Sequence, residues 1–115
     1  MAVRVRSVVI PAAGLGTRIL PATKAFPKEL LPLVDRPIIQ YGVEEAAAAG
    51  IDRVVLVTSP GNNMTAAHFR PNPALEAILE KRGKTESLAL VRRVAELAEL
   101  TTVHQEQPLG LGHAV

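Results

Sequence analysis

The sequence "SVVIPAAGLG", residues Ser7 to Gly16, runs from a short apolar segment into a turn that contains two glycines. Its first part, Ser7 to Ala13, is continuous and rich in β-branched residues, which is typical of a buried strand in a parallel sheet. A second run of this kind, "RVVLVT" at Arg53 to Thr58, follows after a helical pattern. Strand, helix and strand in this order predict a right-handed crossover and a parallel α/β sheet.

Three further segments have apolar residues at the 3.6-residue period of an amphipathic helix. The first helix is expected to begin with Pro37 as its first helical residue and to end before Gly50. The segment "KELLPLV" before it is expected to be extended and irregular, because Pro27 just before it and Pro32 within it preclude a regular helix interior. The expected helices span Pro37 to Ala49, Pro73 to Arg82 and about Glu86 to Leu100, and a later strand is expected over Thr101 to Glu106.

The size and composition of the chain describe one folded domain. Its 115 residues are 48% hydrophobic and 21% charged, which is ordinary for a globular protein. The absence of cysteine excludes disulfides, thiolate nucleophiles and cysteine-based metal sites. No apolar run approaches the roughly 18 to 20 residues of a membrane span, and the first residues lack the pattern of a signal peptide. We therefore expect a cytoplasmic protein without a membrane partner.

The charge is concentrated in the first third of the chain. The net charge is only +2, which argues against a general nucleic-acid binder. Up to Arg36 there are six cations and two anions, whereas the remainder has seven cations and nine anions. The local excess of positive charge favours an anionic ligand near the first strand.

The glycine turn has the features of a phosphate-binding loop. It follows a buried strand, and open α/β folds bind ligands at the carboxyl edge of the sheet. Gly14 and Gly16 let backbone amides approach an anion without a Cβ in the way, and Arg18 and Lys28 supply cationic donors. The alternative interpretation is that the glycines only turn the chain while the cations face water.

Two known phosphate motifs do not fit this loop. The P-loop pattern does not occur in the sequence, and the dinucleotide-binding pattern fails because Ile19 stands where its third glycine or alanine belongs. The glycine turn and its cations therefore predict a polyphosphate site of a different kind.

Longer motifs carry a specific resemblance. In order along the chain they are "PAAGLGTRILPATKAFPKELLPLVDRPIIQY" at Pro11 to Tyr41, "EEAAAAGI" at Glu44 to Ile51, "VLVTS" at Val55 to Ser59, "LEAILEKRGK" at Leu75 to Lys84 and "GLGHAV" at Gly110 to Val115. Together they span nearly the whole chain. The sequence resembles the sugar-phosphate nucleotidyltransferases, and among them the bacterial enzymes that act on UTP and glucose 1-phosphate.

The resemblance implies a Rossmann-like α/β/α fold of three layers with a mixed, mostly parallel sheet, incomplete in this chain. Residues 1–115 would be the N-terminal nucleotide-binding portion of a single nucleotidyltransferase domain. The implied reaction joins UTP and glucose 1-phosphate to give UDP-glucose and pyrophosphate with the help of Mg²⁺. Two alternatives stay open: a transferase for another sugar or base, such as dTTP, and a nucleotide-binding or assembly module without catalysis.

The resemblance also implies roles for individual residues. The backbone of Ala12, Ala13 and Gly14 would meet the nucleoside, while Leu15, Gly16 and Thr17 would wrap the phosphates. Arg18 and Lys28 would hold the triphosphate and are the candidate catalytic residues. Gln105 would read the uracil base together with Gly110, because a side-chain amide both donates and accepts hydrogen bonds as the edge of uracil requires.

The family's metal-binding aspartates and its residues for the glucose phosphate lie beyond Val115. No residue of this chain is therefore assigned as a metal ligand. The segment "GLGHAV" has the pattern of a loop entering a helix, which leads us to expect a fragment with negligible activity alone. The resemblance also implies a homo-oligomer for the complete enzyme.

Overall fold

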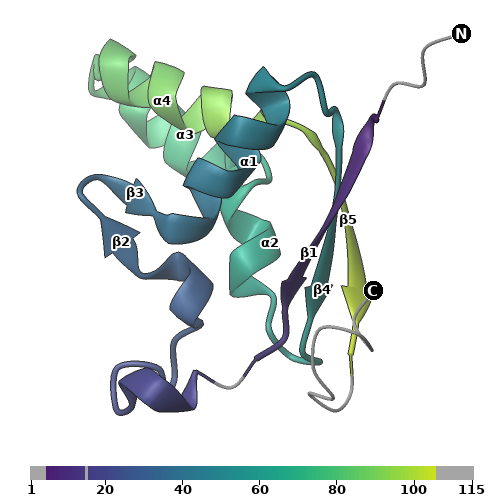
Figure 1. Cartoon of the computed structure of the whole chain (residues 1–115). Helices are drawn as coiled ribbons and strands as arrows, with labels where there is room; N and C mark the ends of the chain where they lie inside the picture. Colours follow the sequence, from purple (N-terminus) through teal and green to yellow (C-terminus); the bar gives the residue numbers. More distant parts are fainter. Residues whose placement is uncertain (1–4, 15, 106–115) are drawn as a thin grey trace, which may run out of the picture.

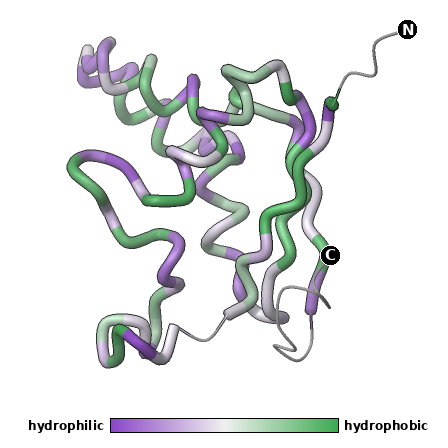
Figure 2. The backbone as a smooth tube through the Cα atoms, viewed as in Figure 1, coloured by the Kyte–Doolittle hydropathy of each residue, from purple (hydrophilic) through white to green (hydrophobic). Residues whose placement is uncertain are grey.

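A computed structural model describes residues 5–14 and 16–105 of the chain (Figure 1). Its main sheet has three strands, β1 (Ser7–Ala12), β4 (Arg53–Thr58) and β5 (Glu99–His104), in the order β1-β4-β5. Both strand pairs are parallel, so the predicted parallel α/β sheet is confirmed. β4 lies in the middle, and β1 and β4 are largely hydrophobic along their length (Figure 2).

The register of the sheet separates a covered face from an open one. Val54 pairs with Val8 and Leu100, and all three contribute to the hydrophobic core. The helices lie on this side of the sheet in Figure 1. The buried core consists of Leu30, Ile39, Val43, Val54, Leu56, Ala66 and Phe69.

The opposite face of the sheet carries apolar side chains that stay accessible. Val9 is 41% exposed on β1 and Val103 is 50% exposed on β5. Strand residues alternate between the two faces, so these valines lie on the face away from the core. The described residues thus form two of the three expected layers, a sheet and one layer of helices (Figure 1).

Four α-helices are described: α1 (Ile38–Ala48), α2 (Met64–His68), α3 (Pro73–Lys81) and α4 (Thr85–Ala95). The short α2 was not predicted as an element of its own. Among the described residues, no helix has both the length and the apolar character that a membrane span requires. Pro37 was predicted to be the first residue of α1, but it has an extended backbone and pairs with Pro32 in a small antiparallel hairpin, β2 (Pro32–Leu33) and β3 (Arg36–Pro37).

The predicted helix over Glu86 to Leu100 was too long. α4 ends at Ala95, and β5 begins at Glu99, two residues before the strand that the sequence predicted. The backbone N–H of Glu99 donates to the carbonyl of Asp52 at 2.8 Å, which joins the first residue of β5 to the sheet. Leu97 lies between α4 and β5 and packs against the core. Pairing with a distant strand therefore overrides the local helical periodicity.

The segment between β1 and α1 is irregular, as predicted, but its middle is not fully extended. Thr17–Ile19 and Lys28–Leu30 each form a single turn of 3-10 helix, named η1 and η2. The expected extended run "KELLPLV" therefore begins with a turn, closed by a hydrogen bond from Leu30 N–H to the carbonyl of Pro27 at 3.1 Å. This turn carries Leu30 into the core and fixes the position of Lys28 beside it.

Candidate functional site

The three strands of the main sheet end at one edge. Ala12, Thr58 and His104 are neighbours in the register, so the residues that follow them lie side by side at the carboxyl edge. The Ser59 hydroxyl donates to the carbonyl of Ala13 at 3.1 Å. Gln105 is buried, and its backbone N–H donates to the carbonyl of Thr58 at 2.8 Å. The carboxyl edge thus brings the start of the glycine turn and the predicted base-reading residue Gln105 to the same side of the sheet.

A cavity of about 330 Å³ opens beside this edge, which is within the size range of small-molecule sites. It lies between the glycine turn, the segment leading to η2, and the loop between β4 and α2. Of the predicted site residues, Ala12, Gly14 and Lys28 line it. The other lining residues are Thr23 to Pro27, Glu29, Ser59, Gly61, Asn62 and Met64.

The side chain of Lys28 lies against the glycine turn. A Cβ atom added to Gly14 would be 3.3 Å from Lys28 Nζ and 3.7 Å from its Cε. The ammonium group therefore lies close to the position that a side chain at residue 14 would take. An amide-rich turn and a lysine in contact with it form an anion-binding arrangement.

Gly16 closes the turn by a close approach to Thr23. Its φ of 66° lies in the left-handed region, and an added Cβ would lie 2.9 Å from Thr23 Cγ2. The Thr23 hydroxyl donates to the carbonyl of Gly16 at 2.6 Å. The sequence identified Gly16 but not Thr23, because a contact between residues seven positions apart in an irregular segment leaves no periodic signal.

Not every predicted residue reaches the cavity. Thr17 and Arg18 are exposed in η1 and do not line it, and Ala13 is buried behind it. Leu15 and Gly110 lie outside the described residues. Lys24 does line the cavity, whereas the sequence alone favoured a side chain that faces water. The described cavity thus has Lys24 and Lys28 as its cations.

Two buried acceptors of the cavity were not predicted. Glu29 Oε1 and Asn62 Oδ1 have no hydrogen-bond partner among the described residues, although Asn62 Nδ2 donates to the Thr65 hydroxyl at 3.3 Å. Burial raises the pKa of Glu29, against the opposing effects of its own backbone N–H and of Lys28. Leaving a buried acceptor unpaired is costly, so both atoms indicate a missing donor. The only sequence signal for Glu29 is its position next to Lys28.

The described residues do not form a magnesium site by themselves. Within residues 5–14 and 16–105, no three His, Cys, Asp or Glu side chains are grouped so that they could hold a metal ion. The cavity at the carboxyl edge has one carboxylate among its described lining residues, that of Glu29. Mg²⁺ usually keeps several waters and needs only one or two carboxylates beside phosphates, so this residue offers a single ligand at most.

The sequence matches a known family over almost its whole length. The profile of the nucleotidyl transferases matches residues 7–115. The chain belongs to the nucleotidyl transferase family. Among curated relatives of this nucleotidyl transferase, the UTP–glucose-1-phosphate uridylyltransferase of Bacillus subtilis is 53% identical over 112 residues, which are 97% of this chain and 38% of the relative. UTP–glucose-1-phosphate uridylyltransferase 2 of Staphylococcus saprophyticus is 50% identical over 97% of this chain and 39% of its own length.

Solved structures agree with this assignment. The UTP-bound UGPase from Acinetobacter baumannii superposes with a TM-score of 0.91 at 45% identity, over 96% of this chain and 39% of that one. A UDP-glucose pyrophosphorylase complexed with UDP-glucose gives a TM-score of 0.76 at 39% identity, with the same coverage. The predicted nucleotidyltransferase fold is thereby confirmed. This nucleotidyl transferase chain spans about two-fifths of the length of these relatives.

Proposed function

We propose that this chain forms the nucleotide-binding part of an enzyme that joins UTP and glucose 1-phosphate to give UDP-glucose and pyrophosphate. The observation that carries the proposal is the position of the Lys28 ammonium group, 3.3 Å from where a Cβ of residue 14 would lie. Both residues line the cavity of about 330 Å³ at the carboxyl edge of the parallel sheet, which we call the nucleotide cavity. The identity of about 50% to uridylyltransferases supports the choice of UTP and glucose 1-phosphate.

In the proposed reaction, an oxygen of the sugar phosphate attacks the α-phosphorus of UTP in line. The bond from the α-phosphorus to the bridging oxygen breaks, and pyrophosphate leaves on the opposite side. The protein's part in such a transfer is alignment and neutralisation of charge. In this proposal Lys28 neutralises phosphate oxygens next to the glycine turn. Lys24 lines the same cavity and would add a second positive charge. Arg18 joins them if η1 moves toward the bound triphosphate.

The nucleoside is proposed to lie along the carboxyl edge, over Ala12 and Ala13 and within reach of Gln105. Gly110, which lies outside the described residues, is proposed to bind next to the base. Glu29 Oε1 and Asn62 Oδ1 accept hydrogen bonds, whereas an ionised triphosphate has no donors to give them. We therefore assign them to hydroxyl groups of the bound nucleotide or sugar.

Mg²⁺ is proposed as the metal that accompanies the triphosphate, where it would offset phosphate charge. Its protein ligands are expected from outside this chain, because Glu29, the one carboxylate among the described residues that line the cavity, is assigned to a hydroxyl group. The small net charge of +2 supports a protein without nucleic-acid partners. A cytoplasmic location, no membrane partner and a homo-oligomeric complete enzyme are proposed with the same function.

Calorimetric titration with UTP and Mg²⁺ tests the proposal on the 115-residue chain itself. We expect saturable binding of UTP, with dTTP and ATP competing more weakly. Tighter binding of dTTP would favour a transferase for another base. Equal, weak binding of UTP, dTTP and ATP would show that this chain does not recognise the base.

An assay of UDP-glucose formation separates an enzyme part from a binding module. The 115-residue chain is expected to be inactive, and a longer chain that carries this segment is expected to be active. An inactive longer chain that still binds UTP would favour the non-catalytic module.

A further inference from the structure

A second cavity, of about 370 Å³, lies between α1, α2 and α4. It shares no lining residue with the nucleotide cavity. One part of its wall is apolar and partly open to solvent, since Leu90 is 55% exposed. This apolar wall consists of Leu75, Leu90, Val91, Val94 and Leu97.

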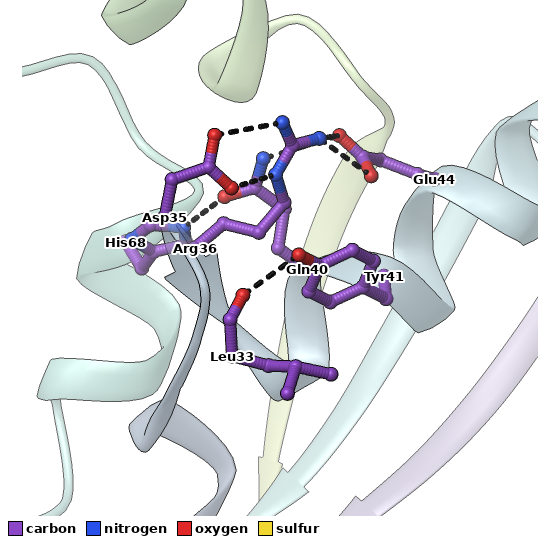
Figure 3. Close-up of polar contacts among 7 residues, drawn as sticks. All are labelled: Leu33, Asp35, Arg36, Gln40, Tyr41, Glu44 and His68. Carbon is purple, nitrogen blue, oxygen red and sulfur yellow. Dashed lines mark hydrogen bonds and ion pairs between the residues drawn. The ribbon is translucent and has the colours of Figure 1, made fainter.

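The opposite part of the wall is a polar network (Figure 3). Arg36 Nη1 donates to both carboxylate oxygens of Glu44, at 2.8 and 3.1 Å, and its Nε and Nη2 donate to Asp35 at 2.9 and 3.2 Å. Gln40 Nε2 donates to Glu44 at 3.2 Å, and Gln40 Oε1 lies 2.7 Å from His68 Nε2. Burial lowers the pKa of His68, which favours the neutral ring. Because Gln40 Oε1 can only accept, this contact assigns the ring proton to Nε2. Both carboxylates of this wall are therefore already held by Arg36.

Two arginines on the same cavity are not held in this way. Arg70 and Arg93 line it, are exposed, and form no ion pair within the described part of the chain. The neighbouring Arg92, by contrast, donates from Nε to Glu76 at 2.9 Å. Since Arg36 neutralises much of the charge on Asp35 and Glu44, the remaining charge on the wall is positive.

We propose that this cavity is a second ligand site, for a small molecule with an apolar body and one oxyanion head group. The apolar body covers Leu75 and Leu90, and the carboxylate or phosphate head meets Arg70 and Arg93. Guanidinium groups bind both head groups through paired N–H donors. A nucleoside triphosphate fits poorly, because it carries several charges and little apolar surface to cover the leucines. The site therefore differs in chemistry from the nucleotide cavity and does not depend on the proposed function.

An NMR titration of the ¹⁵N-labelled 115-residue chain tests the site with three probes that share one ring system. They are 2-naphthoate, 1-naphthyl phosphate and the neutral 2-naphthalenemethanol. We expect both anions to shift the amide signals of α1, α2 and α4, and the neutral probe to bind about fivefold more weakly, as for a partly exposed ion pair. The stronger of the two anions identifies the preferred head group.

The variant Arg70→Gln/Arg93→Gln is expected to weaken anion binding about fivefold. A matched control, Arg82→Gln/Lys84→Gln, removes the same charge outside the cavity and should leave the affinity unchanged. The partly exposed Leu90→Gln should weaken all three probes. Equal loss in the control, equal affinity of the neutral probe, or shifts confined to the open sheet face around Val9 and Val103 would overturn the proposal.

Discussion

The nucleotide cavity and the polar network of Asp35, Arg36, Gln40, Glu44 and His68 use similar side chains in opposite ways. In the network each charged group has a partner of opposite charge, and the amide of Gln40 is bonded at both ends. In the nucleotide cavity, acceptor atoms of Glu29 and Asn62 are buried without partners. Polar groups that satisfy one another stabilise the fold, whereas polar groups left without partners mark where a ligand binds.

The difference follows from the local structure. Gln40 and Glu44 are four residues apart on α1, so they share a face and meet without help from a ligand. Glu29 lies in a one-turn helix and Asn62 in a loop, and neither element repeats. The positions of these two side chains depend on contacts with other segments and not on a repeating backbone pattern. Glu29 Oε1 and Asn62 Oδ1 have no hydrogen-bond partner among the described residues.

The largest expected effect is on catalysis. In a full-length enzyme that carries this segment, Lys28→Ala should lower kcat/KM by about 100-fold or more, as for loss of one charge-stabilising donor. The fold should be unchanged, because the Lys28 side chain is exposed to the cavity. Steady-state kinetics beside Lys81→Ala, a change on the surface of α3, measure this. Unchanged kcat and KM would remove Lys28 from the site.

The turn that supports the nucleotide cavity is expected to tolerate no side chain at residue 16. Gly16→Ala should lower the free energy of unfolding by about 1–3 kcal/mol, because it combines a left-handed backbone with the 2.9 Å contact to Thr23. Urea unfolding of the 115-residue chain measures the loss. Adding Thr23→Ser removes Cγ2 and should restore part of it. A Gly16→Ala variant as stable as the parent would contradict the geometry of the turn.

Matched carboxylate changes test the comparison directly. Glu44→Gln should destabilise the chain by about 1 kcal/mol, because Arg36 loses a charged partner. Glu29→Gln should leave stability unchanged or raise it, since a neutral amide avoids the cost of burying a carboxylate charge. It should instead weaken ligand binding in calorimetry. The reverse result, a stabilising role for Glu29 and none for Glu44, would break the distinction between the two regions.

The hairpin that carries Arg36 holds a strained residue. Val34 has a φ of 67° and is 92% exposed, so its side chain has few contacts to lose. Val34→Asn should raise the free energy of unfolding by about 0.5–1 kcal/mol, because asparagine adopts the left-handed region more readily. Thermal unfolding measures the gain, with Leu33→Asn as a control outside that backbone region. A loss of stability would show that Val34 contributes a contact of its own.

The smallest effect concerns pH. The pKa of folded His68 lies below its ordinary value, so the unfolded chain binds more protons near pH 6. Its contribution to stability is fully present above about pH 6.5 and is lost as pH falls from there through the folded pKa. His68→Gln should flatten this dependence in urea midpoints measured from pH 8 to pH 5. An unchanged slope would mean that His68 is protonated equally in both states.

Much of the fold was predictable because several elements carry their own boundaries. β1 and β4 are continuous apolar runs, and α3 lies between Pro73 and a glycine. The end of α4 was not predictable, because apolar spacing continues past Ala95 while Glu99 already pairs with the distant Asp52. Long-range contacts of this kind are absent from a local pattern.

The candidate site was also predictable only in part. Gly14 and Lys28 were identified from a motif, and both line the same cavity in the structure. The roles proposed for Arg18 and Gln105 stay predictions. Thr23 and Asn62 were missed, because each depends on where an irregular segment folds back on the cavity. Sequence patterns reveal side chains that act near each other along the chain more readily than those assembled from separate loops.

The exposed valines on the face of the main sheet away from the core affect how readily the chain associates in solution. Salts that strengthen the association of apolar surfaces, such as ammonium sulfate, should drive copies together through Val9 and Val103. Dilute samples in chloride buffers, without sulfate, are therefore the right medium for every titration.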